Sequence, residues 1–146
     1  MTRIEQNRVA IRQFLEDVWS KGNVEIAERI IDPNFQFILA FAHLDGRAAF
    51  MGLVERNRSI FENLTYSVES EDDIVADDTK GAAFWAMKSK HIGTWRNVPA
   101  SYKDVAINGM TLFRFNEEGK IYEAKVQNDV MSLMNQIGGI KKLYDF

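Results

Sequence analysis

The carboxylate of greatest chemical interest in this 146-residue sequence is that of Asp129. It stands where a long strand pattern, which begins at Lys120, passes into an apolar helix pattern that begins at Val130. Asp is a preferred residue for capping the first turn of a helix, so a cap is one interpretation of this position. The other is a general acid or base, which has to act from within a protected pocket. Strict alternation places Asp129 on one strand face with Glu123 and Lys125, and this favours the cap.

Two histidines are further candidates for proton transfer, because imidazole changes its charge near neutral pH. His91 shares a strand face with Trp85, and His43 ends an apolar stretch just before a predicted helix. The two are far apart in the sequence, and neither has neighbours at the spacing of metal ligands. The residues alone favour a histidine that is fixed in the core or at its rim, with a catalytic role as the alternative.

The motifs of several common enzyme classes are absent. The sequence has no glycine-rich phosphate loop, no dinucleotide-binding fingerprint and no nucleophile elbow. It contains no Cys, which excludes disulfides, thiolate catalysis and cysteine-based metal sites. The acidic residues from Glu69 to Asp78 lack the pattern of a calcium loop and indicate a solvated rim. We therefore expect no metal site.

The composition is that of an ordinary soluble domain, with 46% hydrophobic and 27% charged residues and only two Pro. We expect residues 1–146 to form one domain. A net charge of −3 argues against a nucleic-acid partner and against an anionic membrane surface. The charged start MTRIEQNR is not a signal peptide, and no apolar run approaches the roughly 20 residues that span a bilayer. These features predict a cytoplasmic protein.

Hydrophobic periodicity divides the chain into helices followed by strands. Helical spacing predicts helices over residues 2–21, 23–32 and 46–61 and a closing helix over 130–137. Asn23 is a candidate N-cap of the second helix, Pro33 is expected to end it, and Asp45 is a candidate N-cap of the third. Apolar or alternating runs predict strands over residues 35–41, 64–71, 81–92, 102–115 and 120–129.

This order predicts an α+β fold in which helices gather on one side of an antiparallel sheet. Both faces of the long strands carry apolar residues: Ala82 and Phe84 lie on one face of residues 81–92, and Ala83 and Trp85 on the other. The helices can cover only one face. Since a monomer rarely exposes a large apolar patch, we expect a homo-oligomer, a dimer or a tetramer, built on the other face.

Ordered segments along nearly the whole chain resemble the SnoaL-like polyketide cyclases, a family with the nuclear-transport-factor-2-like fold. The resemblance is carried by RQFLEDVWSKGN at 12–23, IDPNF at 31–35, HIG at 91–93, PASYK at 99–103, GMTLFR at 109–114, GKIYE at 119–123, Asp129 and LMNQIG at 133–138. It implies a cone-shaped α+β barrel in which a curved antiparallel sheet and the N-terminal helices enclose an apolar cavity. It also implies a small apolar or polyketide-like substrate and intramolecular aldol ring closure without metal or cofactor.

The resemblance assigns roles to particular side chains. It implies that Asp129 is the acid/base and that His91 lines the same cavity, where it would polarise a carbonyl or relay a proton. The residues expected to shape the substrate site are Trp85, Trp95, Tyr102, His43 and Lys125. One carboxylate is enough for such chemistry, because a carbon acid between two carbonyls gives up its proton readily.

Two departures from the family pattern point to a variant substrate or a related isomerisation. Lys125 stands where family members usually carry Trp, and residues 99–103 read PASYK where they usually read PPTGK. Three alternatives remain: an isomerase like ketosteroid isomerase, an epoxide hydrolase that would use Asp104, Arg114 and Asp129, and a non-catalytic ligand-binding or dimerisation module.

Overall fold

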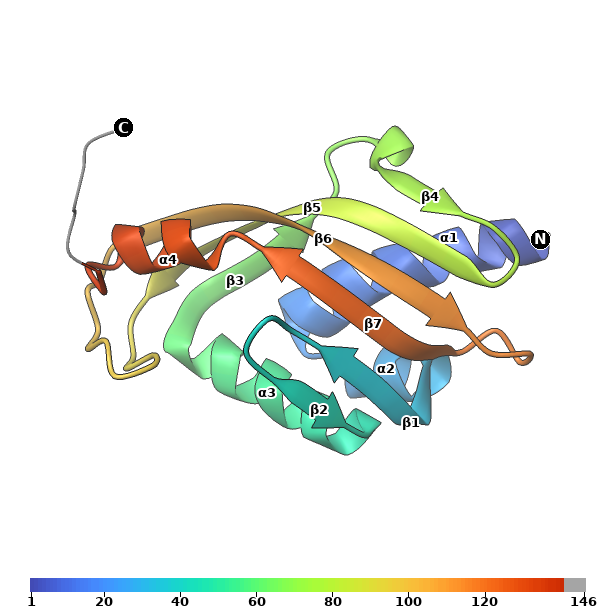
Figure 1. Cartoon of the computed structure of the whole chain (residues 1–146), viewed down its shortest axis with the longest axis horizontal. Helices are drawn as coiled ribbons and strands as arrows, with labels where there is room; N and C mark the ends of the chain where they lie inside the picture. Colours follow the sequence, from blue (N-terminus) through green and yellow to red (C-terminus); the bar gives the residue numbers. More distant parts are fainter. Residues whose placement is uncertain (141–146) are drawn as a thin grey trace.

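Three helices lie within the first 60 residues of the computed structural model, which describes residues 1–140 (Figure 1). They are α1 (Arg3–Gln13), α2 (Val24–Ile30) and α3 (Arg47–Ile60), and α1 continues into a π-helical segment at Phe14–Trp19. Thr2 and Glu5 form a capping box at the start of α1, and the Asn23 side chain caps α2, as the sequence predicts. No helix within residues 1–140 is both long enough and apolar enough to cross a membrane.

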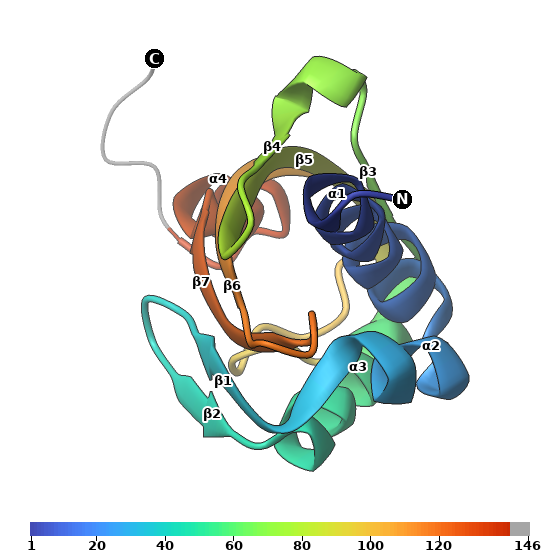
Figure 2. The same ribbon diagram turned by 90° about the vertical axis from the view of Figure 1, so that its right-hand side faces the viewer.

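Within residues 1–140, seven strands form one curved sheet that does not close into a full barrel (Figure 2). They are β1 (Ile31–Ile38), β2 (His43–Asp45), β3 (Phe61–Ser67), β4 (Ile74–Ala76), β5 (Lys80–His91), β6 (Asp104–Phe115) and β7 (Ile121–Asn128). The order is β2-β1-β7-β6-β5-β3, and β4 pairs with β5. A short helix, α4 (Val130–Gln136), follows β7. The expected fold class, α+β with a curved sheet and N-terminal helices, is confirmed.

The pairing of β1 differs from the expectation of a wholly antiparallel sheet. β1 runs parallel to β7, with Ile31 opposite Ile121 and Gln36 opposite Glu123. Pro33 lies inside this strand and does not end the preceding helix, which stops at Ile30. The register shifts between the two pairs, where Pro33 offers no N–H to the ladder.

The third helix also begins differently from its prediction. Asp45 is the last residue of β2, where its carboxylate accepts a hydrogen bond from Gln36 Nε2 at 2.6 Å. Gly46 is the N-cap of α3, in a conformation with φ +100° that a residue with a Cβ rarely adopts. The short strands β2 and β4 were not expected, because three residues carry too little alternation to detect.

The concave face of the sheet packs on the helices, and the sheet curves around α1 when viewed along that helix (Figure 2). Phe50 of α3 lies at the centre of an aromatic cluster and is fully buried. Four rings surround it at centroid distances between 4.7 and 5.4 Å: Phe14, Trp19, Phe35 and Phe37. These contacts join α3 to the π-helical segment and to β1.

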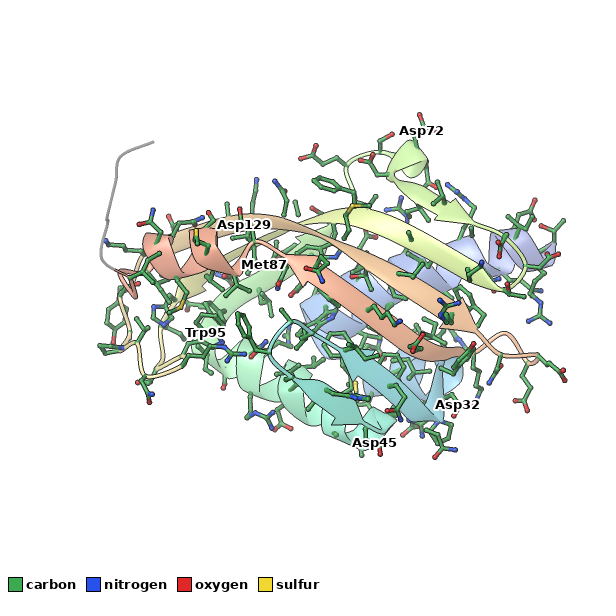
Figure 3. All side chains as sticks on the ribbon, in the orientation of Figure 1. Asp32, Asp45, Asp72, Met87, Trp95 and Asp129 are labelled. Atoms are coloured by element: carbon green, nitrogen blue, oxygen red, sulfur yellow. The ribbon has the colours of Figure 1, made fainter. Side chains whose placement is uncertain are left out.

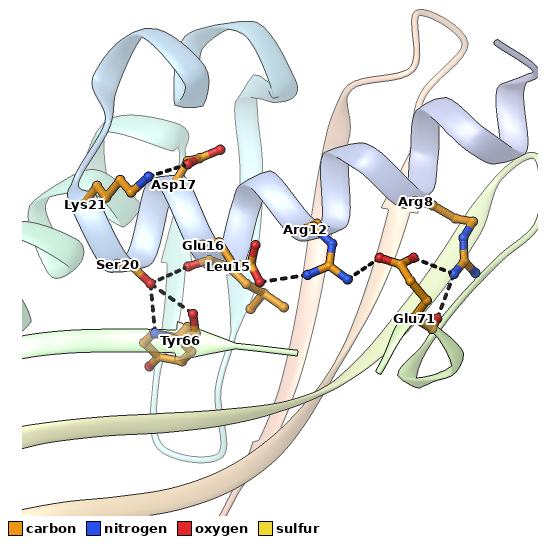
Figure 4. A network of polar contacts seen from close by, with 9 residues as sticks. All are labelled: Arg8, Arg12, Leu15, Glu16, Asp17, Ser20, Lys21, Tyr66 and Glu71. Atoms are coloured by element: carbon orange, nitrogen blue, oxygen red, sulfur yellow. Dashed lines mark hydrogen bonds and ion pairs between the residues drawn. The ribbon is translucent and has the colours of Figure 1, made fainter. Parts of the chain in front are cut away.

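Polar contacts fasten α1 to the segment between β3 and β4 (Figure 4). Arg12 donates to Glu16 at 2.8 Å and also pairs with Glu71, while Arg8 reaches a second oxygen of Glu71 at 3.2 Å. Hydrogen bonds from Arg12 and Arg8 hold the pKa of the Glu71 carboxyl below its ordinary value. The side chains of this network are partly or largely exposed, so it lies outside the buried core.

Candidate functional site

A cavity of about 100 Å³ lies between the concave face of the sheet and the helices. All three tryptophans of the chain, Trp19, Trp85 and Trp95, line it together with Tyr66. Polar groups reach it from Asn57, Thr111, Arg96 and Asn128. Because the wall combines aromatic rings with a few polar groups, it has the character of a small-molecule site.

Trp85 of β5 forms part of the cavity wall because Gly109 lies beside it. The two residues face each other across the β5–β6 pair, and the space that a Cβ at Gly109 would fill is occupied by the Trp85 ring. Trp85 Nε1 donates to Thr111 Oγ1 at 2.9 Å, and both side chains are buried. The glycine and the hydroxyl together fix the orientation of the ring.

Replacing Gly109 with Ala is expected to lower the free energy of unfolding by about 1–3 kcal/mol, the usual cost of overpacking a core. The new methyl group must displace the Trp85 ring and weaken its bond to Thr111. Urea unfolding followed by tryptophan fluorescence measures the change. Gly52→Ala is the matched control, since Gly52 lies within α3 and has room for a methyl group. A Gly109→Ala protein as stable as the wild type would contradict the assigned role.

Tyr66 of β3 reaches the cavity between two indole rings. Its ring lies 5.1 Å from that of Trp19, in a stacked arrangement, and 4.9 Å from that of Trp85. Its backbone N–H donates to Ser20 Oγ at 2.8 Å, which attaches β3 to the end of the π-helical segment (Figure 4). Burial raises the pKa of the Tyr66 phenol, so the hydroxyl stays protonated and can donate a hydrogen bond.

The exposed residues of the cavity wall come from two loops, the turn between β1 and β2 and the loop between β5 and β6, and we call this part the mouth of the cavity. Figure 3 shows Trp95 in the second loop. Phe41 of the first loop is 65% exposed. The Arg96 guanidinium of the second lies 5.2 Å from the Phe41 ring centroid and 5.3 Å from that of Trp95. Within residues 1–140, Arg96 is the only charged residue that lines the cavity.

Asp129 lies at the junction of β7 and α4 (Figure 3). Its Oδ1 accepts a hydrogen bond from the backbone N–H of Ser132 at 3.0 Å, so it caps α4. The side chain is exposed and does not line the cavity, although its neighbours Asn128 and Val130 both do. The structure thus places Asp129 beside the cavity, in the capping geometry that the sequence pattern favours.

His91 is fully buried at the end of β5 and does not line the cavity. The Ser101 backbone N–H donates to His91 Nδ1 at 3.1 Å, which leaves the proton of a neutral ring on Nε2. That nitrogen is enclosed without a hydrogen-bond partner among the described residues. Phe61 packs against His91 at 5.5 Å and against Trp95 at 5.9 Å, so the histidine supports the cavity wall from behind.

Trp85 and Trp95 line the cavity, whereas three other expected substrate contacts lie outside its wall. Tyr102 is 68% exposed in the β5–β6 loop. His43 is exposed on β2, with Nε2 2.6 Å from Gln36 Oε1. Lys125 is exposed on the convex face of β7, between two buried neighbours. None of these three contacts the cavity in this structure.

The carboxylates and arginine of the hydrolase alternative are not brought together. Asp104 and Arg114 lie near opposite ends of β6, roughly 30 Å apart at the usual strand rise. Arg114 Nε is paired with Glu123 at 2.8 Å. Within residues 1–140, no group of three or more acidic or histidine side chains is arranged to hold a metal ion.

Several cavity residues had no sequence signal of their own. Trp19 occupies an ordinary apolar helix position, and Asn57 is a polar residue within α3. Arg96 lies in an irregular loop with φ +47°, and Asn128 is an end residue of β7. Only the fold brings these four positions together, because they come from four separate segments.

A family model described as SnoaL-like polyketide cyclase matches residues 9–137. The match includes every residue that lines the cavity. A search of curated protein sequences finds no relative of this chain.

Solved structures with a similar fold include a candidate SnoaL-like polyketide cyclase from Jannaschia sp. CCS1. It is 17% identical, with a TM-score of 0.84, and the match covers 97% of each chain. TsrD from Streptomyces laurentii is 16% identical, with a TM-score of 0.81 over 93% of this chain and 97% of TsrD. A SnoaL-like polyketide cyclase from Agrobacterium tumefaciens strain C58 is 15% identical, with a TM-score of 0.74 over 90% of this chain and 98% of its own. At these identities the likeness establishes the fold alone.

Proposed function

Because the chain belongs to the SnoaL-like polyketide cyclase family, we propose that it catalyses a ring closure or isomerisation of a small carbonyl compound in this cavity, without a cofactor. The observation that carries the proposal is a tryptophan- and tyrosine-lined cavity next to the one carboxylate at the β7–α4 junction. The aromatic wall excludes water and holds an apolar chain folded. Such confinement brings the two reacting carbons of one molecule together.

The proposed chemistry needs one acid/base group. The carboxylate of Asp129 takes a proton from a carbon between two carbonyls, and the resulting enolate carbon attacks a ketone carbon of the same molecule. The alkoxide that forms then takes the proton back from Asp129, so that a carbon–carbon bond is gained and no external reagent is used. Proton transfer by a positioned side chain typically contributes about 10²–10⁴-fold to the rate.

Asp129 would reach the substrate by a rotation of its side chain. Its neighbours Asn128 and Val130 line the cavity, so the backbone at this junction is already part of the wall. Turning inward breaks the hydrogen bond to Ser132, at a cost of about 1 kcal/mol for a lost cap. We therefore infer that the cap is the resting position of the acid/base, which turns inward when a substrate fills the cavity.

Tyr66 is the proposed hydrogen-bond donor to the negative oxygen that develops. Its phenol remains protonated because burial raises its pKa. A fixed donor in an apolar cavity stabilises a developing oxyanion more than it stabilises a neutral carbonyl. In this scheme His91 is a positioning residue, which acts on Trp95 through Phe61.

The size of the cavity limits the substrate. An apolar cavity of about 150 Å³ holds one benzene ring, and this one measures about 100 Å³. The enclosed space is thus smaller than one benzene ring needs, so a substrate of a single ring, or the short chain that closes into one, extends into the mouth of the cavity. A flat substrate with several fused rings would require the wall to open.

One observation favours a second candidate, a protein that binds a small apolar ligand without catalysis. Within the described residues, neither a carboxylate nor an imidazole lines the cavity. A binding protein needs only the aromatic wall and the polar groups that orient a ligand.

The two candidates are distinguished by hydrogen–deuterium exchange at the carbon between the two carbonyls of a β-keto ester with one ring, which is un-ionised at neutral pH. A cyclase or isomerase accelerates this exchange above the rate in buffer, and Asp129→Asn removes the acceleration. A binding protein is stabilised against heat by the same compound but leaves the exchange rate unchanged. NMR follows both the exchange and the binding in one sample.

We further propose that the convex face of the sheet forms a dimer interface. Phe84 and Met110 face each other across the β5–β6 pair, and Leu112 lies next to them. Their side chains are 45%, 52% and 36% exposed. A cluster of large apolar side chains at the centre of a sheet is the kind of surface that a second copy buries.

Light scattering is expected to return about twice the 16.8 kDa mass of the chain at micromolar concentration. Met110→Asp is expected to give a monomer with unchanged circular dichroism, because it places a charge at the centre of this face. Val24→Asp is the control, since Val24 is similarly exposed but lies on α2. A wild-type mass of 16.8 kDa at both high and low concentration would exclude the dimer.

A further inference from the structure

The mouth of the cavity carries one positive charge that the proposed reaction does not use. The Arg96 guanidinium lies 5.2 Å from the Phe41 ring centroid and 5.3 Å from that of Trp95. Arginine over an aromatic face is attracted by the electrons of the ring, and its planar group loses little freedom there. Two rings therefore hold the guanidinium at the entrance.

The N–H groups of Arg96 remain available. Within residues 1–140, Arg96 donates no side-chain hydrogen bond, and it is not among the arginines paired with a carboxylate. Other arginines of the chain bind backbone carbonyl groups. Arg58 donates a hydrogen bond to the carbonyl oxygen of Ser20, and Arg47 donates one to that of Ile31. Stacking occupies the faces of a guanidinium and leaves its edge, which carries the donors, free to bind a ligand.

The surroundings determine which ligand group fits. In the part of the chain that the structure describes, the wall beyond Arg96 is aromatic and apolar, and its polar groups are neutral. A ligand that fills the cavity therefore presents an apolar ring or chain inward and can place one anionic group at the mouth. A planar carboxylate matches the forked guanidinium through two parallel hydrogen bonds.

From this geometry we infer that the substrate is a free carboxylic acid, and that Arg96, held between Phe41 and Trp95, binds its carboxylate at the mouth of the cavity. The inference rests on the proposed function in that it takes this cavity to be the substrate site. Arg96 then sets the orientation, because only the uncharged end of the molecule enters the aromatic part. An ester or amide of the same acid loses this contact and binds more weakly.

The test compares 3-phenylpropanoate with 3-phenylpropanamide, which has nearly the same shape but no charge. Binding is followed by the fluorescence of the three tryptophans, all of which line the cavity. The wild type is expected to bind the acid about ten times more tightly than the amide, and added NaCl is expected to reduce the difference. Arg96→Gln is expected to lower the affinity for the acid to that for the amide and to leave the amide unchanged.

Two further variants control for charge and shape. Arg96→Lys is expected to retain only part of the preference, because Lys keeps the charge but loses the fork and the stacking. Arg29→Gln removes an exposed arginine on α2 and is expected to retain the full preference for the acid over the amide.

Equal affinity for acid and amide in the wild type would overturn the inference. It would also be overturned if Arg96→Gln lowered the affinities for the acid and for the amide by the same factor. The exchange experiment separates this failure from that of the proposed function. Catalysed exchange without a preference for the acid contradicts only the proposed role of Arg96. A preference for the acid that depends on Arg96, without catalysed exchange, supports the carboxylate site and contradicts the proposed cyclase activity. The absence of binding by either compound would overturn both.

Discussion

Asp129→Asn is expected to reduce catalysed proton exchange by about 10²–10⁴-fold while the thermal midpoint stays nearly unchanged. Asn and Asp cap helices about equally well, so the hydrogen bond from Ser132 survives the substitution. The amide cannot accept and return a proton at neutral pH, however, so the acid/base step is lost. Exchange measured by NMR and melting followed by circular dichroism give the two quantities on the same preparation.

Asp129→Ala and Asp104→Asn complete this comparison. Alanine removes both the carboxylate and the cap, so it is expected to abolish exchange and also to cost about 1 kcal/mol of stability. Asp104→Asn removes an exposed carboxylate from the far end of β6 and is expected to change neither quantity. Full activity in Asp129→Asn would leave the residue with its capping role alone and would assign the acid/base step to another group.

Phe50→Ala is expected to lower the free energy of unfolding by about 3–5 kcal/mol. Phe50 is fully buried and contacts four aromatic rings, so its removal takes contacts from α3, β1 and the π-helical segment together. That loss is a large fraction of the roughly 5–15 kcal/mol that stabilises a domain. Urea unfolding monitored by circular dichroism measures it.

Phe41→Ala is the matched control, because Phe41 is 65% exposed at the cavity mouth. Its removal is expected to change the stability by less than about 0.5 kcal/mol. The void left by Phe50 lies against Trp19 and Phe37, which line the cavity, so larger rings should then bind. Similar stability losses in the two variants would show that the aromatic cluster does not carry the core.

The fold was largely predictable because its longer elements carry strong patterns. Buried and exposed residues alternate along nearly the whole of β6. Thr2 and Asn23 are residue types that cap helices, and each accepts a hydrogen bond from the backbone N–H three residues later. The parallel contact of β1 with β7 was not predictable, because periodicity identifies a strand but not its partner.

The site was less predictable than the fold. Trp85 and Trp95, which the sequence analysis expects to shape the substrate site, both line the cavity. Trp19 and Arg96 were missed, because a helical aromatic resembles any core residue and an exposed loop arginine resembles any solvated one. The strand alternation favoured the capping orientation that Asp129 has, whereas the resemblance implied a carboxylate inside the cavity.

The parallel pairing of β1 with β7 has a consequence for the order in which the molecule assembles. β1 is made early in synthesis, but one of its two neighbours in the sheet is β7, the last strand within residues 1–140. Contacts between such distant segments slow folding, because a long loop must close before they contribute any stability. The cavity wall takes Phe37 from β1 and Val126 from β7, so the binding site exists only after that closure. A nascent chain that lacks β7 therefore has an incomplete cavity wall, and occupancy by a ligand reports that β7 has paired with β1.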